Sequence, residues 1–275
     1  MTSTVSAGDG EHGGGRVGLA PPAAAVRARL ALVGFLFALA GLAWWWTADE
    51  MRGMDNGPGT DLGALGWFVG IWLVMMAAMM FPSVSPTVAL YSRMTRSREP
   101  AAPLVFTAGY LLAWGATGLL AYGIFDVGHR LLGAQLSWNR GGHWAAGGTL
   151  LAAAVYEVTP LKDVCLGKCR SPLGFLLGAW RGGVSGALQM GVRHAGWCIG
   201  CCWALMAALF ALGVMSLIWM GFIAGLIAVE KTLPWGRSVT YATAGLLLLL
   251  GVVVLVAPGS LPGFTIPGGG SMGMR

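Results

Sequence analysis

The stretch RHAGWCIGCCW, residues 193–203, carries three of the five cysteines of the chain and one of its four histidines. Residues 204–212 follow it and are apolar and rich in helix-forming residues, so we expect the cluster to open a membrane helix. At about 100° per residue, one arc of that helix carries four donor side chains: His194, Cys198, Cys201 and Cys202. One imidazole and three thiols on one face form a donor set suited to Cu(I) or Zn(II).

Packing is the alternative explanation for these cysteines, because cysteine behaves as a small apolar residue in membrane helices. Three cysteines in five positions, beginning one helical turn after a histidine, favour metal or redox chemistry over packing. Five cysteines in two clusters are also not the even, spaced set that is typical of a secreted disulfide framework.

The composition places the whole chain in a membrane. Of its 275 residues 56% are hydrophobic and only 10% are charged, and the mean hydropathy is +0.70. Apolar runs approach the ~20 residues that cross a bilayer. They predict an all-α polytopic membrane bundle of about seven transmembrane helices, at residues 30–46, 62–91, 104–125, 144–159, 195–212, 214–229 and 239–257.

Three further segments complete the predicted organisation. Residues 173–192 are apolar but interrupted by glycines and Arg181, so we expect an interfacial or re-entrant segment there. The Gly-, Ala- and Ser-rich residues 1–26 predict a disordered tail, and residues 258–275 predict a flexible one. Residues 27–257 then form the integral membrane domain.

The basic residues predict the orientation. With seven spans and a cytoplasmic N-terminus, all of the 17 Lys and Arg residues except Arg52, Arg130, Arg140 and Arg275 fall on the cytoplasmic side. We therefore expect a bacterial cytoplasmic (inner) membrane protein with its N-terminus inside. The net charge of +6 serves this topology and does not indicate a nucleic-acid partner.

A second group of soft donors lies in the second predicted span, where residues 75–83 read MMAAMMFPS. Its thioethers, at i, i+4 spacing on one broad face, favour Cu(I): Met75, Met76, Met79 and Met80. Methionine is also an ordinary gap filler, so packing is an equal alternative for this motif alone. Pro82, directly after it, predicts a kink in the helix.

The longest polar connection carries the other two cysteines. Cys165 and Cys169 are four residues apart, beside Lys162 and Lys168, and could hold a metal or form a disulfide. We expect the neighbouring cations to lower the pKa of these thiols and to favour thiolate. The orientation above places this pair at the cytoplasmic face, where it could accept or pass on a metal.

Several segments, in this order and spacing, resemble a bacterial family of predicted metal-binding integral membrane proteins, a domain family of unknown function often labelled copper chaperone. The likeness covers roughly residues 66–237. It rests on MMAAMMFPS at 75–83, YEVTPLK at 156–162, Cys165-x3-Cys169 followed by RSPLGF, His194-x3-Cys198-x-Gly200 followed by CCWALM, and Glu230-Lys231-x3-Trp235-Gly236. The resemblance implies a membrane protein that binds a metal.

Together these features predict a membrane copper-binding protein, a Cu(I) chaperone or transporter, with zinc as the second choice. Its expected partners are the lipid bilayer, the metal ion and a copper-donating or copper-accepting protein. The chain has no Gly-x4-Gly-Lys-Ser/Thr motif, which argues against ATP-driven pumping by this chain alone. A binding protein is favoured over an enzyme. Two alternatives stay open: a membrane thiol–disulfide oxidoreductase that uses Cys198 and Cys201, and a structural subunit of a membrane complex.

Overall fold

A computed structural model describes residues 22–50, 63–95, 99–132, 141–213, 216–233 and 236–257. Within these ranges the regular structure is helical, which confirms the all-α prediction. The helices are α1 (Pro22–Glu50), α2 (Leu65–Thr95), α3 (Ala102–Leu132), α4 (His143–Glu157), α5 (Pro160–Arg170), α6 (Pro172–Ala179), α7 (Gly183–Leu212), α8 (Leu217–Thr232) and α9 (Gly236–Val256). The predicted tails, 1–26 and 258–275, lie outside the described residues, except that 22–26 belong to α1.

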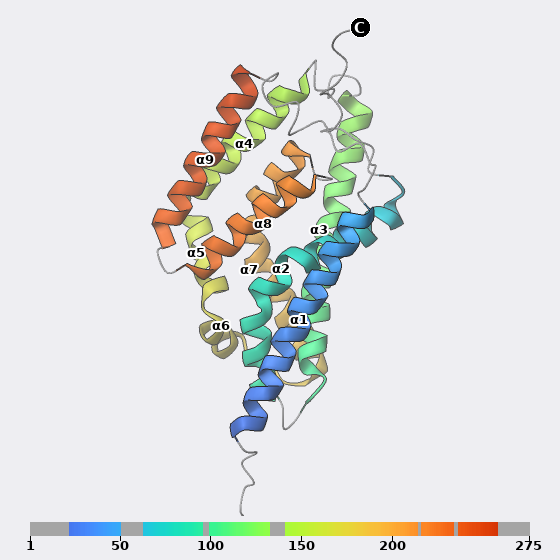
Figure 1. Cartoon of the computed structure of the whole chain (residues 1–275), viewed down its shortest axis with the longest axis vertical. Coiled ribbons are helices and arrows are strands. Elements are labelled where there is room, and N and C mark those ends of the chain that lie inside the picture. The colour runs from blue at the N-terminus through green and yellow to red at the C-terminus, as the bar shows by residue number, and fades with distance from the viewer. Residues whose placement is uncertain are drawn as a thin grey trace, which may run out of the picture.

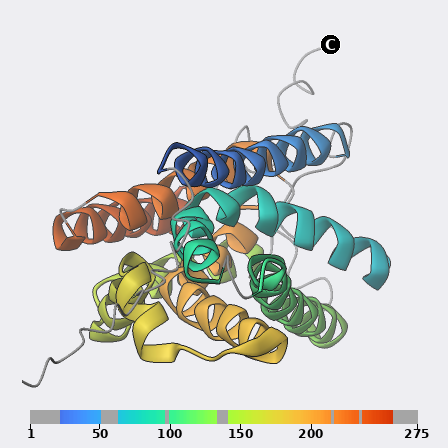
Figure 2. The same cartoon turned by 90° about the horizontal axis from the view of Figure 1, so that it is seen from below.

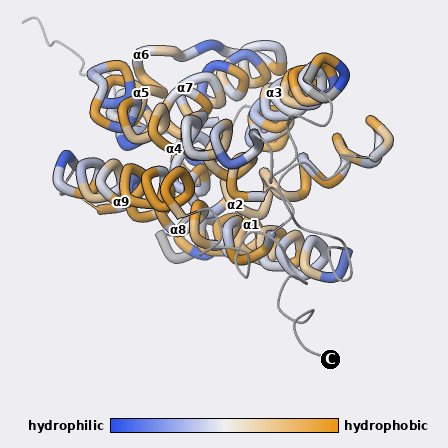
Figure 3. Tube along the Cα trace, turned by 90° about the horizontal axis from the view of Figure 1, so that it is seen from above, coloured by the Kyte–Doolittle hydropathy of each residue, from blue (hydrophilic) through white to orange (hydrophobic). Residues whose placement is uncertain are grey.

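Five of the helices are long and apolar enough to cross a membrane: α1, α2, α3, α7 and α9. Large apolar side chains such as Leu30, Leu120 and Leu249 are exposed on their outer faces, and hydrophobic residues cover much of α9 (Figure 3). The 15 residues of α4 and the 16 of α8 would extend only about 22–24 Å, less than a bilayer core of about 30 Å. The count of seven spans therefore stays a prediction.

Helix α7 organises the bundle, because it packs against α3, α4, α5 and α8. On the outside, α1 lies along α2, and α9 lies along α4 (Figures 1 and 2). The short helices α5 and α6 connect α4 to α7 at one end of the bundle (Figure 1). Side chains from α2, α5, α7 and α8 can therefore meet in the interior.

The start of α7 corrects two predictions. The cysteine cluster does not open a helix, because α7 begins at Gly183 and places the cluster in its middle. Residues 183–192 are likewise part of this helix, and α6 accounts for only the first part of the expected re-entrant segment. The glycines that suggested an interruption are compatible with a helix here, because small residues allow close packing between membrane helices.

Helix α2 continues through Pro82 and Pro86, and it bends along its length (Figures 1 and 2); a kink at Pro82 itself stays a prediction. A proline at position 86 cannot donate to the carbonyl of Pro82. The hydroxyl of Ser85 donates to that carbonyl at 2.9 Å instead. This hydrogen bond explains how a proline is tolerated inside a membrane helix.

Glycines allow α3 and α7 to approach closely. A Cβ atom at Gly191 would lie 2.0 Å from the carbonyl oxygen of Phe106, and one at Gly109 would lie 2.4 Å from that of Leu188. Both obstacles are backbone atoms, which cannot turn away as a side chain can. The spacing of α3 and α7 therefore depends on glycine at both positions.

We expect Gly191→Val to separate α3 from α7 and to destabilise the bundle by at least the ~1–3 kcal/mol typical of overpacking. Gly196→Val is the matched control, because Gly196 lies on the same helix and a Cβ there would meet no atom within 4 Å. Thermal unfolding of both variants in detergent checks this prediction. Equal midpoints for the two variants would contradict the close approach of α3 and α7.

Candidate metal centre

Three cysteine sulfurs converge where α5 meets α7. The Sγ atoms of Cys169, Cys198 and Cys201 all lie within 4.8 Å of one another. Those of Cys169 and Cys201 are 3.7 Å apart. Cys198 and Cys201 are each only 2% exposed, and the five cysteines of the chain are free thiols. Three thiols at this spacing, two of them buried and that of Cys169 half-buried, could hold a metal ion.

Local structure fixes both helices that supply these sulfurs. Helix α5 begins where the Thr159 side chain accepts a hydrogen bond from the backbone N–H of Lys162, followed by proline at the first helical position. At its other end, the guanidinium of Arg170 donates to the carbonyl of Leu233, just after α8. On α4, the Tyr156 hydroxyl donates to the carbonyl of Gly200 at 2.6 Å. These contacts position α5 and α4 against the middle of α7.

The sulfur of Cys198 has three further neighbours from other helices. Met80 Sδ of α2 is 3.9 Å away, the Tyr110 hydroxyl of α3 is 3.1 Å away, and Lys231 Nζ of α8 is 3.0 Å away. The same ammonium group lies 3.4 Å from Ser83 Oγ. An ammonium group this close favours a negative charge on the sulfur. Cys198 is thus the point where five helices meet.

His194 lies on the same arc of α7 and is buried, as the helical spacing predicts. Its ring packs among Phe106, Tyr110 and Phe175, with ring centroids at 5.9, 6.1 and 4.8 Å. Its Nδ1 atom is buried and has no hydrogen-bond partner among the described residues. The group of mutually close ligand atoms contains three cysteine sulfurs and no nitrogen of His194. The role of His194 as a ligand therefore stays a prediction.

The other predicted donors are buried nearby. Cys202 donates its S–H to the carbonyl of Cys198 at 3.0 Å and is not a member of the three-sulfur set. Cys165 packs against α7 at Gly200, which has no side chain. A Cβ atom added at Gly200 would lie 2.7 Å from the sulfur of Cys165. In α2 the remaining thioether residues belong to the buried core: Met75, Met76 and Met79.

The electrostatics of the α5 cysteines differ from the sequence-based expectation. The pKa of the Cys169 thiol is raised above its ordinary value, by hydrogen bonding to the sulfurs of Cys198 and Cys201 and by burial. Burial also raises the pKa of Cys165, together with the charge of Cys201. The predicted lowering was wrong because Lys168 is exposed to solvent and Lys162 pairs with glutamates. A raised pKa favours the protonated thiol at both positions.

The sequence profile of a family described as PpoB2, copper chaperone, matches residues 69–254. The chain belongs to this family of copper chaperones. The matched range includes the three clustered cysteines and the residues that contact Cys198, from Met80 to Lys231. Neither the curated protein sequences nor the solved structures contain a match. For a copper chaperone family member, a buried cluster of thiols beside a thioether is the expected type of donor set.

Sequence reasoning missed two residues of this centre, Tyr110 and Lys231. Lys231 is a charged residue near the end of an apolar helix, and such residues in membrane proteins commonly mark functional sites. That signal was present, as was the Glu230–Lys231 pair among the family-like segments. Tyr110 has no comparable signal, because one tyrosine in an apolar helix resembles any packing residue. Its contact with Cys198 arises only from the packing of α3 against α7.

Proposed function

We propose that this protein binds Cu(I) as cargo and passes it to a partner protein. The proposed ligands are the thiolates of Cys169, Cys198 and Cys201, with the thioether of Met80 as a fourth donor. One observation carries the proposal: three thiols within 4.8 Å of one another, with a thioether sulfur 3.9 Å from one of them. Thiolate and thioether together form a soft donor set, which favours Cu(I).

The spacing fits a bound ion. A metal that binds three sulfurs at about 2.3 Å keeps those sulfurs roughly 4 Å apart. The separation of 3.7 Å between Cys169 and Cys201 and that of 3.9 Å between Cys198 and Met80 are close to this value. Small side-chain movements would therefore complete the site, without a rearrangement of helices.

The ammonium group of Lys231 would offset part of the charge of a Cu(I) complex. Three thiolates around Cu(I) leave an excess of two negative charges, and the ammonium group of Lys231 lies 3.0 Å from one of the sulfurs. A nearby positive charge stabilises such a complex in a buried site.

We propose that the remaining predicted donors surround the three-sulfur site and do not bind the ion within it. His194 and Cys202 lie on α7 beside the three-sulfur site, and Cys165 lies one helical turn before Cys169. Met76 lies one turn before Met80 on α2, with Met75 and Met79 on the neighbouring strip of that helix. They would form a path of soft donors leading to and from the site. We propose the cytoplasmic face as the side of exchange, since the charge bias predicts that α5 lies on that side.

A thiol–disulfide oxidoreductase is the second candidate, and one observation favours it: Cys169 and Cys201 lie 3.7 Å apart. This pair differs from the Cys198–Cys201 pair that the sequence suggests. The copper proposal also accounts for Met80 and Lys231, which a dithiol would not require. The alternative of a structural subunit assigns no role to Lys231 beside Cys198.

Met80→Leu tests the thioether. We expect the variant to bind Cu(I) at least several-fold more weakly, while Zn(II) binding by the thiols is unchanged, because zinc does not favour thioether ligands. The fold should persist, since exchange of Met for Leu usually costs under about 1.5 kcal/mol. Competition titrations of purified protein with a Cu(I) chelator and with a Zn(II) chelator measure both affinities.

Met220→Leu is the control, because it makes the same change at a buried methionine of α8 that is not among the proposed donors. If Met80→Leu leaves Cu(I) affinity unchanged, the thioether is not a ligand. If the wild-type protein binds no Cu(I) under reducing conditions, the proposed function is wrong.

A further inference from the structure

A second buried polar cluster, separate from the sulfur site, lies where α4, α5 and α8 meet. Lys162 of α5 donates one hydrogen bond to Oε2 of Glu157 and another, of 2.7 Å, to Oε2 of Glu230. Glu157 is 1% exposed, Lys162 0% and Glu230 2%. We refer to these three residues as the buried triad. Neither the copper site nor its proposed ligands require it.

The charges of the buried triad do not balance. Two carboxylates and one ammonium group sum to one excess negative charge if all three are ionised. The Oε1 atoms of Glu157 and Glu230 are both buried, and neither has a hydrogen-bond partner among the described residues. Burial of an uncompensated charge is unfavourable, and two carboxylates that share a site disfavour simultaneous ionisation. Some positive species must therefore accompany the triad.

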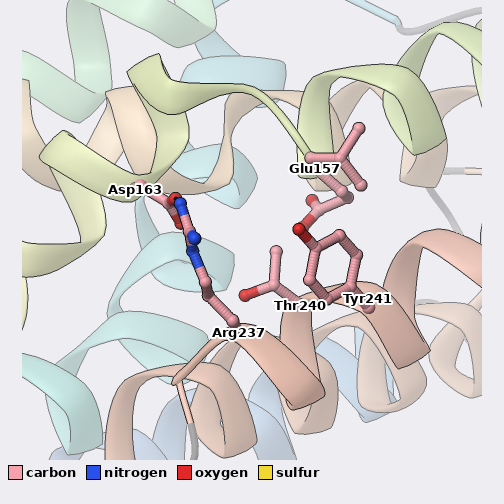
Figure 4. Close-up of a pocket in the computed structure, with 6 residues that line it drawn as sticks. Glu157, Asp163, Arg237, Thr240 and Tyr241 are labelled. Carbon is pink, nitrogen blue, oxygen red and sulfur yellow. The ribbon is translucent and has the colours of Figure 1, made fainter.

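The surroundings of the triad offer a route to water. A pocket lined by Glu157, Asp163, Arg237 and Tyr241, together with Val158 and Thr240, adjoins the triad on the side of α9 (Figure 4). Arg237 and Asp163 form an ion pair of 3.1 Å, and both are exposed. Glu157 and Tyr241 lie next to each other in this pocket (Figure 4). Glu157 therefore lines the same pocket as the exposed side chain of Arg237.

Among the residues that the structure describes, the cations near the triad are already engaged elsewhere. Arg237 of α9 is engaged with Asp163 of α5, and Lys231 of α8 points to Cys198. The thiols of Cys165 on α5 and Cys201 on α7 lie near enough to interact electrostatically with Tyr156, the residue before Glu157. The phenol group of Tyr241 on α9 lines the same pocket as Glu157. These groups supply no positive charge to the carboxylates.

We propose that Glu157, Lys162 and Glu230 form a proton-binding site. One carboxyl group carries a proton and is a neutral acid, while the other is a carboxylate paired with Lys162. The proton exchanges with water through the pocket beside α9. It binds to an oxygen of the carboxyl pair, and on release it leaves a carboxylate behind. Because Glu230 precedes Lys231 in α8, occupancy of this site sets the charge immediately next to the sulfur cluster.

Infrared spectroscopy of the full-length protein tests the proposal. We expect wild-type protein without metal to show, at neutral pH, the C=O stretching band of a protonated carboxyl group, which shifts in D2O and is lost at alkaline pH. Among the described residues, Glu157 and Glu230 are the carboxyl groups that are buried, so the band can be assigned to them. Absence of this band from folded wild-type protein would overturn the proposal, whatever the behaviour of any variant.

Two single variants assign the band. We expect Glu157→Gln and Glu230→Gln each to abolish it, because the one remaining carboxylate pairs with Lys162 and stays ionised. Asp126→Asn is the control, since it removes a solvent-facing carboxylate of α3 that pairs with Arg130 and not with the triad, and it should leave the band intact. A band that persists in both glutamine variants would contradict the assignment. Stabilisation of the wild-type protein by sodium ions, without an acid band, would indicate a metal-cation site in place of a proton site.

Discussion

Cys198→Ser is expected to abolish tight binding of Cu(I). The sulfur of Cys198 lies within 4.8 Å of both other thiols, 3.9 Å from Met80 and 3.0 Å from the ammonium group of Lys231. A hydroxyl group is a poor ligand for a soft ion. Loss of an outer-shell partner alone costs about 10–100-fold in metal affinity, so we expect loss of this ligand to cost more than about 100-fold.

The fold should persist in Cys198→Ser, because serine is close to cysteine in size and its hydroxyl can still accept a hydrogen bond from Lys231. Competition titration against a Cu(I) chelator measures the affinity, and thermal unfolding without metal measures the fold. Cys165→Ser is the matched control, since Cys165 is also buried against α7 but lies outside the three-sulfur set. Full Cu(I) affinity in a folded Cys198→Ser variant would place the copper site elsewhere.

Lys162→Met is expected to give the largest loss of stability. The side chain of Lys162 is fully buried and bridges the carboxylates of Glu157 and Glu230. Removing one partner of a buried ion pair typically costs about 3–5 kcal/mol, because it leaves a buried charge uncompensated. Methionine fills a similar volume, so the loss reports charge and not a cavity. Unfolding in detergent, followed by thermal or denaturant titration, measures it.

The acid dependence of Lys162→Met gives an independent check. Lowering the pH protonates both carboxyl groups and removes the buried charge, so the stability difference from wild type should shrink as the pH falls. Lys168→Met is the control, because Lys168 lies on the same helix but is exposed. Equal stability of Lys162→Met and Lys168→Met at neutral pH would show that the buried triad contributes nothing to the fold.

Local regularities in the sequence were enough to predict much of this architecture. Apolar stretches of sufficient length predict membrane helices, and five of the helices meet that criterion. The helical repeat places His194, Cys198, Cys201 and Cys202 on one face of one helix, and all four are buried. The length of an apolar stretch and the face of a helix on which a residue lies both depend on residues close together in the chain. For the same reason the sequence indicated Cu(I) or Zn(II) as the type of ion.

The start of α7 was predicted less well, because glycine has two opposite effects on a membrane helix. It weakens an isolated helix, which suggested that α7 begins near residue 195. It also permits the close approach of α3 at Gly191, and this packing stabilises the helix from Gly183 onwards. A preference of a few tenths to one kcal/mol per residue is easily outweighed by such packing.

The sequence by itself determined the helical membrane class, the soft-donor character of the site and the face of α7 that carries it. The tertiary structure decided which donors meet. Cys169 joins Cys198 and Cys201, while His194 lies among aromatic rings. Lys162 lies between glutamates that are 5 and 68 positions away in the chain. Helical periodicity fixes directions within one helix, but distances between helices depend on how α2, α5, α7 and α8 pack against one another. A metal site or a proton site assembled from several helices therefore exists only after that packing is complete.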